Sequence, residues 1–389
     1  MDAARYTMNW NYPTAIRVGV GRIRELPECC RRLGMQAPLL ITDPGLAGLP
    51  MISLALDACQ AEGLRTGLFH EVKSNPTGRN VAAGVTAYAA GDHDGVIAFG
   101  GGSALDAAKA VALMVGQDRP LWDFEDVGDN AARVRVEGMA PVVAVPTTAG
   151  TGSEVGRASV ITDEDAHLKR IIFHPRMLPA QVILDPLLTV GLPPRITAAT
   201  GMDALSHSLE AYCSPYFHPM AEGIALEGMR LVREWLPRAV ADGTDEEARL
   251  HMLVASSMGA TAFQRGLGAM HALAHPLGAL YDAHHGLLNA ILMPYVLQAN
   301  RSAIEEPMAR LARYLDLPKG GFDGMLDWVL SLRDGVGIPN RLADIGIDDK
   351  QVERVGKMAA EDPSAGSNPI AFDAAQYSYL FVKALEGHL

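Results

Sequence analysis

The sequence predicts a doubly wound α/β domain followed by an all-helical domain, and two patterns of hydrophobicity support this prediction. Over residues 15–190, short aliphatic runs alternate with helical stretches, as in folds with helices on both faces of a parallel sheet. After Pro193 and Pro194 the strand-like runs stop, and apolar residues recur at spacings of three and four. We therefore expect an α/β domain over residues 1–193 and a helical domain over residues 194–389.

The clearest strand-like runs are short, nearly continuously hydrophobic, and closed by Gly, Pro or Asp. This is typical of parallel strands that are buried on both faces. In the second half, an apolar stripe predicts a helix from Ile196 to Tyr212, and residues 243–247 look like a helix start with acidic first-turn residues. The strand-like runs cover residues 37–42, 95–99, 141–145 and 181–184.

Composition narrows the class of protein. The net charge of −12 argues against nucleic acid as a partner, because a surface that follows phosphates needs a basic excess. No apolar run of about eighteen residues is present, and the N-terminus lacks a basic segment followed by an apolar one, so we expect neither a membrane span nor a signal peptide. The four cysteines form no disulfide framework. These features favour a soluble, cytoplasmic protein.

A glycine-rich loop follows the strand-like run that ends at Phe99. Gly100, Gly101 and Gly102 precede a helix-forming stretch that starts at Ser103 and includes Asp106. Glycines let the backbone approach an oxyanion, and the following helix start offers free N–H groups. We expect a pyrophosphate site here, with an unliganded turn as the alternative. The earlier pair of glycines at residues 19 and 21 lacks the third glycine of a dinucleotide fingerprint and is interpreted as a turn.

A second polar loop follows the next strand-like run and contains Thr147, Thr148 and Thr151. In an open α/β sheet, ligands bind beyond the carboxyl ends of the strands, so both loops should border one crevice. Asp43 closes another strand, and its carboxylate suits the hydroxyls of an adenosine ribose. Its negative charge would repel the 2′-phosphate of NADP. NAD is therefore favoured over NADP, although Asp43 beside a proline also fits an ordinary turn.

The helical half concentrates possible metal ligands. Asp203 and His207 are separated by four residues, so both project from one face of a helix, and His271 and His275 have the same spacing. A carboxylate and imidazoles among apolar neighbours are costly unless something compensates them. Such a set suits a first-row transition metal such as Fe²⁺ or Zn²⁺. The alternative for each histidine taken alone is a purely structural role, as a capping or surface residue.

Four motifs, in order along the chain, resemble the iron-containing (group III) alcohol dehydrogenases. The resemblance covers roughly residues 15–300 and implies a Rossmann-like first domain, a helical metal-binding domain, bound NAD and iron, and a homodimer. It implies Asp203, His207, His271 and His285 as ligands, with the neighbouring His284 left out, and His275 as a proton relay beside the nicotinamide. The motifs are the loops at residues 100–109 and 146–154 and the segments 201–207 and 271–286.

The resemblance also implies which residues contact the cofactor. The family's contacting positions fall on Asp43, Asn75, Gly101, Gly102, Ser103, Thr147, Thr148 and Lys169, and Gly100, Asp106 and Thr151 of the two loops are counted with them. Residues 367–370 depart from the Asn-Pro-Arg of many relatives, so nothing is inferred from that segment.

Two arginines bear on the substrate. Arg157 stands where many relatives have a neutral residue, and Arg265 precedes His271 by six residues. Because Arg pairs bidentately with carboxylates, a substrate with an acid group is expected, and both arginines also resemble the 4-hydroxybutyrate dehydrogenases of the family. The alternative for either arginine is a structural ion pair. The hypothesis is oxidation of 4-hydroxybutyrate, or reduction of succinate semialdehyde.

Three other functions compete with this hypothesis. A reductase of small neutral aldehydes or diols, of the lactaldehyde or 1,3-propanediol type, would use the same machinery. A lyase of the dehydroquinate synthase type would need several basic residues, which the neutral stretch around His271 lacks. A non-catalytic binding protein would not need a complete ligand set and an intact glycine loop.

Overall fold

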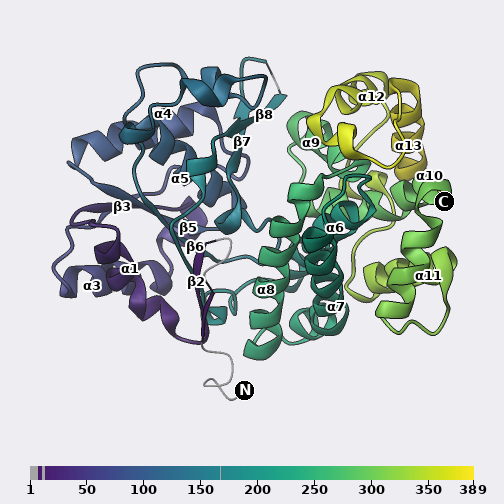
Figure 1. The fold of residues 1–389 in the computed structure, drawn as a ribbon, viewed down its shortest axis with the longest axis horizontal. Helices are drawn as coiled ribbons and strands as arrows, with labels where there is room; N and C mark the ends of the chain where they lie inside the picture. The colour runs from purple at the N-terminus through teal and green to yellow at the C-terminus, as the bar shows by residue number, and fades with distance from the viewer. Residues whose placement is uncertain (1–7, 11–13, 167) are drawn as a thin grey trace. The chain divides into compact units, whose positions relative to one another are not determined.

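The computed structural model describes residues 8–10, 14–166 and 168–389, which form two compact units. The first unit contains residues up to 148 and residues 152–190, and the second contains residues 149–151 and 191–389. The short segment Ala149–Thr151 therefore belongs to the second unit, although the chain on either side of it belongs to the first. Figure 1 shows the strands in the first unit and a purely helical second unit.

The first unit is built on a sheet with the strand order β1-β2-β9-β6-β5-β3-β4. All neighbours pair in parallel except β1 and β2, which are antiparallel. The predicted parallel sheet is confirmed, and β1, β2 and β4 add to the strands expected from hydrophobicity. The strands are β1 (Met8–Trp10), β2 (Ala15–Val18), β3 (Pro38–Ile41), β4 (Gly67–Phe69), β5 (Gly95–Gly100), β6 (Val142–Pro146) and β9 (Gln181–Leu184).

Helices cover both faces of this sheet, with α1 and α3 on one side and α4 and α5 on the other (Figure 1). Three cysteines, Cys29, Cys30 and Cys59, are free thiols in the core between α1, α3 and the sheet, as small buried hydrophobes. A separate antiparallel hairpin, β7 (Ala158–Asp163) and β8 (Leu168–Phe173), was not expected from the sequence. The helices are α1 (Leu26–Arg32), α2 (Pro44–Ala47), α3 (Pro50–Ala61), α4 (Gly78–Ala90) and α5 (Gly102–Met114).

The second unit consists of helices, as predicted. The helix expected from Ile196 is α6 (Pro194–Cys213), which is buried along most of its length and packs against α7, α8 and α10. The expected helix start near residue 245 is also present, since the Asp245 carboxylate accepts a hydrogen bond from the Ala248 amide. Within the described residues, no helix is both long and apolar enough to cross a membrane.

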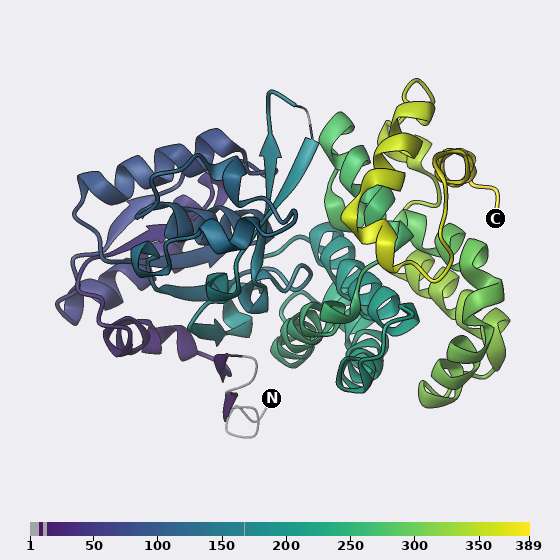
Figure 2. The same cartoon turned by 45° about the horizontal axis from the view of Figure 1, so that its top comes forward.

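Figure 2 shows the same helices from a second direction, with α12 and α13 packed side by side, as their contacts also indicate. Helices α9 and α10 follow one another through a tight connection in which Asp282 takes a left-handed conformation, with φ of 51°. The remaining helices are α7 (Pro219–Ala241), α8 (Glu246–Ala262), α9 (Ala269–Tyr281), α10 (His285–Tyr314), α11 (Gly321–Gly335), α12 (Val352–Glu361) and α13 (Ala374–Glu386).

Candidate metal centre and cofactor loops

The glycine loop joins the buried strand β5 to helix α5. Gly100 has φ of +148°, and a Cβ atom there would lie 2.7 Å from the Ala104 Cβ, so glycine is required. Gly101 is extended and precedes the first helical residue, Gly102, without a side-chain cap. The N-cap residue Gly101 therefore supplies no side chain that would bond the N–H groups of the first turn of α5. This arrangement fits a pyrophosphate.

Other predicted cofactor residues lie at the carboxyl ends of the neighbouring strands. Strand β5 pairs with β3 on one side and β6 on the other, so Asp43 and Thr147 follow the two strands that flank the glycine loop. The Thr147 amide donates to the Gly100 carbonyl at 2.9 Å. The Asp43 Oδ1 atom caps α2 by accepting from the Gly45 and Leu46 amides. Asp43 is therefore also an ordinary turn residue that caps a short helix, which was the alternative to a cofactor contact.

Two further predicted residues come close to the loop through backbone contacts. The Ser103 hydroxyl donates to the Ser74 carbonyl, which places Asn75 beside the start of α5. The Thr162 amide of β7 donates to the Pro76 carbonyl at 2.7 Å, and Thr162 is the pairing partner of Lys169 in β8. Asn75 and Lys169 therefore both lie near the segment 74–76. Thr148 lies against Gly101, whereas Thr151 belongs to the second unit.

Asp106 is used by the protein itself. Its Oδ1 atom accepts from the Ser153 hydroxyl, and its Oδ2 atom accepts from the Val160 amide at 2.9 Å. The neighbouring Lys109 is 1% exposed, and its Nζ lies 3.0 Å from the Ser153 carbonyl and 3.3 Å from Asp106. Burial lowers the pKa of Lys109. Asp106 therefore holds the second loop against α5.

The predicted metal ligands come together in the second unit from three helices. Potential ligand atoms of Asp203 and His207 on α6 and of His271 on α9 all lie within 4.8 Å of one another. These residues are buried, at 2%, 4% and 1% exposure. His285, the first residue of α10, has its Nε2 atom 3.9 Å from the Asp203 Oδ1. All four ligands implied by the resemblance therefore lie in one cluster, which we call the metal pocket.

Local sequence explains how α10 comes so close to α6. A Cβ atom at Gly286 would lie 2.6 Å from the Ala199 carbonyl oxygen and 3.0 Å from the Asp203 Cβ, so only glycine allows this approach. The adjacent His284 caps α10, because its Nδ1 atom accepts from the Leu287 amide. Its role as a cap agrees with leaving His284 out of the ligand set.

The donor set fits a divalent transition metal. Burial lowers the pKa of His207 to about 4, so its imidazole is neutral and has a free lone pair. Its Nδ1 atom is buried and has no hydrogen-bond partner within the described residues. The buried Asp203 carboxylate would also be costly without a cation nearby. Three imidazoles and one carboxylate are ligands that Fe²⁺ and Zn²⁺ share.

Glu210 supports the metal pocket and was missed by the sequence interpretation. This buried carboxylate accepts from the Gly268 and Met270 amides and from the His271 Nδ1, at 2.8, 2.6 and 2.7 Å. Burial alone would lower the pKa of His271, but Glu210 raises it on balance. Because the Nδ1 proton is held by Glu210, the Nε2 lone pair of His271 faces the pocket. The sequence feature that could have revealed Glu210 is its spacing of three residues from His207, which places both on one face of α6.

His275 lies next to this pocket and is held by Asp362. The His275 Nδ1 is 2.8 Å from the Asp362 Oδ2, and the His275 ring stacks on that of His285 with centroids 5.4 Å apart. Burial alone would raise the pKa of Asp362, but His275 and the Ser364 amide lower it on balance. No pattern near residue 362 in the sequence predicted this pairing.

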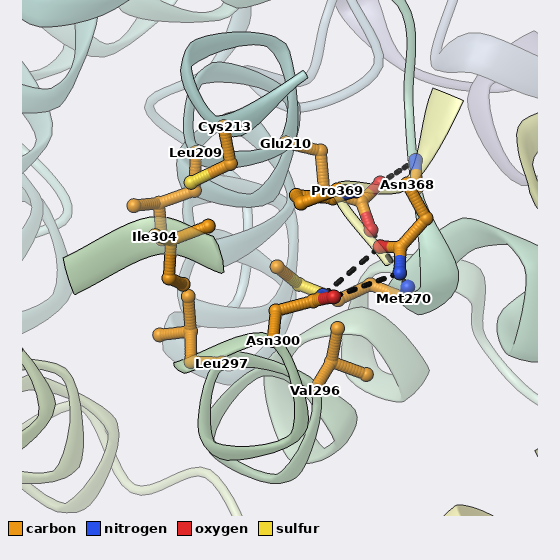
Figure 3. Close-up of a pocket in the computed structure, with 11 residues that line it drawn as sticks. Leu209, Glu210, Cys213, Met270, Val296, Leu297, Asn300, Ile304, Asn368 and Pro369 are labelled. Atoms are coloured by element: carbon orange, nitrogen blue, oxygen red, sulfur yellow. Dashed lines mark hydrogen bonds between the residues drawn. The ribbon is translucent and has the colours of Figure 1, made fainter. Parts of the chain in front are cut away.

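A small cavity lies behind Glu210, between α6, α9 and α10 (Figure 3). Asn300 and Asn368 form a reciprocal amide pair beside it, with bonds of 3.0 and 2.9 Å. Asn368 also accepts from the Ala269 amide at 3.1 Å and so caps the start of α9, which carries His271. The segment 367–370, from which the sequence allowed no inference, thus anchors a ligand-bearing helix.

The two predicted substrate arginines differ. Arg265 donates to the carbonyls of Ala211, Tyr212 and Tyr216, and its Nη2 pairs with Glu222 at 2.9 Å. All three guanidinium nitrogens are therefore engaged, and the ion-pair alternative holds for Arg265, which we remove from the substrate site. Arg157 is exposed in the first unit, with its guanidinium carbon 5.8 Å from the centroid of the Phe173 ring.

Comparison with known proteins agrees with this arrangement. The family model for iron-containing alcohol dehydrogenase matches residues 13–186, and the model for the C-terminal part of that family matches residues 197–385. The chain is 38% identical over 386 residues to a 4-hydroxybutyrate dehydrogenase of Cupriavidus necator, covering 96% of this chain and 99% of that protein.

Solved structures give the same result. A crystal structure of a 1,3-propanediol oxidoreductase matches with a TM-score of 0.91 and 32% identity, covering 97% of this chain and 99% of that one. A sulfoacetaldehyde reductase from Bifidobacterium kashiwanohense, in complex with NAD⁺, matches with a TM-score of 0.87 and 29% identity, with the same coverage of both chains. Taken with the ligand cluster and the glycine loop, these matches show that the chain belongs to the iron-containing alcohol dehydrogenase family.

Proposed function

We propose that this metal-dependent, NAD-linked alcohol dehydrogenase oxidises 4-hydroxybutyrate, or a similar ω-hydroxy acid, to the semialdehyde. The observation that carries the reaction type is the buried cluster of Asp203, His207 and His271 beside the His275–Asp362 pair. The substrate is supported by the 38% identity to a 4-hydroxybutyrate dehydrogenase and by Arg157, whose charge suits a carboxylate.

Each part of the site has a defined task in this proposal. The ion, held by Asp203, His207, His271 and His285, would act as a Lewis acid on the substrate oxygen, and NAD⁺ would accept the hydride. Gly101, Gly102 and Ser103 would bind the pyrophosphate through the first turn of α5.

His275 would take the hydroxyl proton. Its Nδ1 proton is directed to Asp362, so the neutral ring has its lone pair on Nε2. That atom is the base in the proposed proton path, directly or through water. Asp362 keeps the ring in this tautomer and orientation.

A second candidate function is the oxidation of neutral alcohols and diols. The engagement of Arg265 with backbone carbonyls and Glu222 favours it, because one of the two predicted carboxylate-binding arginines is no longer available. The match to the 1,3-propanediol oxidoreductase points the same way.

A substrate comparison separates the two candidates. The rate of NADH formation is measured with 4-hydroxybutyrate, 1,4-butanediol and 1-butanol for the wild type and for Arg157→Gln. We expect the variant to lose roughly tenfold in kcat/KM for the acid only, about 1.4 kcal/mol. Equal turnover of acid and neutral alcohol, unchanged by Arg157→Gln, would refute the acid substrate and leave the neutral one.

We also propose that the enzyme is a cytoplasmic homodimer. The four cysteines are free thiols, which suits a reducing compartment. Light scattering of the purified protein at several concentrations measures the oligomeric state, and a mass other than twice that of the 41.5 kDa chain contradicts the dimer.

A further inference from the structure

Asn289 lies at the centre of the metal pocket, although the family ligand pattern does not include it. It is fully buried on α10, four residues after His285. Its Nδ2 atom lies 2.8 Å from the Asp203 Oδ1, 3.1 Å from the His271 Nε2 and 3.2 Å from the His285 Nε2. Three of the four ligands thus converge on one side-chain amide.

The amide faces these atoms as a donor. Because the His271 Nδ1 proton is directed to Glu210, the His271 Nε2 is an acceptor, and so is the Asp203 carboxylate. The Asn289 N–H groups therefore satisfy acceptors that would otherwise face one another. The Asn289 Oδ1 atom, in contrast, is buried with no hydrogen-bond partner within the described residues. A buried carbonyl oxygen without a partner is an unfavourable arrangement that needs an explanation.

The distances suggest what this oxygen does. Two atoms bonded to one divalent ion at about 2.1 Å lie about 3.0 Å apart at a right angle and about 3.4 Å apart at a tetrahedral angle. The Asn289 Nδ2 lies 2.8 to 3.2 Å from three ligand atoms. It therefore occupies the place of a neighbouring ligand. A half-turn about the Cβ–Cγ bond would exchange Nδ2 for Oδ1 at this place, and amide oxygens bind divalent cations.

We propose that Asn289 is a fifth residue of the metal centre, whose amide donates to the ligands before the ion binds and turns its oxygen to the ion afterwards. The proposal rests on the metal-binding part of the proposed function and is independent of the substrate. A fixed donor role, in which Asn289 only orients Asp203, is the competing explanation.

Two substitutions separate these explanations. Asn289→Leu removes both polar atoms at similar size, and Asn289→Asp keeps an oxygen but has no N–H to donate. Affinity for Zn²⁺ is measured by competition with a chromophoric chelator, on the full-length, metal-stripped enzyme. We expect Asn289→Leu to bind Zn²⁺ at least tenfold more weakly. Asn289→Asp should bind it as tightly as the wild type or more tightly.

The metal-free proteins and their Co²⁺ forms provide independent readouts. Both variants should melt at a lower temperature than the wild type without metal, because the ligand acceptors lose their donor. The visible bands of the Co²⁺ form should be stronger in Asn289→Leu, as expected when a site changes from five-coordinate to four-coordinate. Should Asn289→Leu not fold, Asn289→Ser, whose shorter side chain does not reach the ligands, takes its place.

Asn80→Leu is the matched control. Asn80 is also a buried amide, but it lies on α4 of the first unit, where it hydrogen-bonds the Thr77 amide and the Glu71 carbonyl. This control should lower the melting temperature and leave Zn²⁺ affinity within about twofold. Equal loss of Zn²⁺ affinity in Asn289→Leu and Asn289→Asp would establish the fixed donor role and overturn the proposal, as would unchanged affinity in both. A wild type that binds no metal would instead refute the proposed function.

Discussion

The glycine loop of the first unit and the metal pocket of the second unit are built in different ways. At the glycine loop, the surface offered to a ligand is backbone, and the nearby side chains of Asp106 and Lys109 hold the second loop in place. In the metal pocket, the ligand atoms belong to side chains, and other buried side chains orient some of them: Glu210 bonds His271, and Asn289 bonds Asp203. A backbone site depends on a few glycines, whereas a side-chain site depends on supports that come from distant parts of the chain.

The largest expected effect tests whether the four ligands are correctly chosen. His285→Ala should lose bound metal and lower kcat by roughly a thousandfold, because a Lewis acid contributes several kcal/mol to catalysis. His284→Ala removes the cap of α10 and should retain metal, at a cost of about 1 kcal/mol in stability. Metal content by elemental analysis, with turnover and thermal melts, checks both. Metal lost from His284→Ala but kept by His285→Ala would reverse the assignment.

A smaller effect is expected from the supports. Glu210→Gln keeps the shape of the side chain but replaces one acceptor oxygen with a donor that faces the amides of Gly268 and Met270 or the His271 Nδ1. We expect roughly 10- to 100-fold weaker metal binding, as for other partners of metal-bound histidines. The dissociation constant is measured by chelator competition. Unchanged affinity would mean that His271 is oriented by packing alone, and the contrast between the two sites would weaken.

At the first unit, Asp43→Asn tests the one side chain whose charge should matter for the cofactor. Asparagine keeps the Oδ1 acceptor that caps α2 and removes the negative charge. The preference of kcat/KM for NAD⁺ over NADP⁺ should fall about tenfold, about 1.4 kcal/mol, with little change in melting temperature. If the preference is unaltered, Asp43 is a helix cap and does not select the cofactor.

The smallest effect concerns an ion pair of the first unit, between the buried Arg17 and the partly exposed Glu28. The Arg17 guanidinium hydrogen-bonds Glu28 and lowers the pKa of that carboxyl from 4.5 to about 2. A lowered folded-state pKa stabilises the fold above the unfolded value, and this contribution is lost as the pH falls from about 4.5 towards 2. Because Glu28 is 45% exposed, the contribution should be below about 1 kcal/mol.

Urea denaturation of the wild type and Glu28→Gln at pH 7 and pH 3 measures this contribution. The wild type should be the more stable protein at pH 7, and the difference should shrink to roughly half at pH 3. A difference as large at pH 3 as at pH 7 would show that Glu28 stabilises α1 by packing rather than by its charge.

Long periodic patterns made most of the fold predictable from sequence. Buried parallel strands and the stripe along α6 depend on hydrophobicity that repeats over many residues, and both were predicted. Strand β4 was missed because it has only three residues, and the β7–β8 hairpin because it lies outside the main sheet. Short strands depend on pairing with distant segments, which no local pattern records.

The residues of the site also differ in whether a local pattern or only the tertiary fold reveals them. Asp203, His207 and His271 were visible because helical spacing and motif context coincide. Asn289 has the same spacing of four residues from His285, but an amide among aliphatic residues attracts less attention than a histidine. Asp362 meets His275 only through the tertiary fold, over 87 residues. Arg265 misled because its charge was visible in the sequence, whereas the backbone carbonyls that bind it were not.

The passage of Ala149–Thr151 into the second unit limits how this protein can be divided. A fragment that begins at Gly191 would lack Gly150, whose backbone lies beside the His207 imidazole and against Thr200. Such a fragment would expose the ligand-bearing face of α6 at that point. Exchange of the metal-binding unit between relatives therefore requires two segments to be transplanted together, and a single crossover near residue 193 would leave the hybrid pocket with a three-residue piece from the wrong parent.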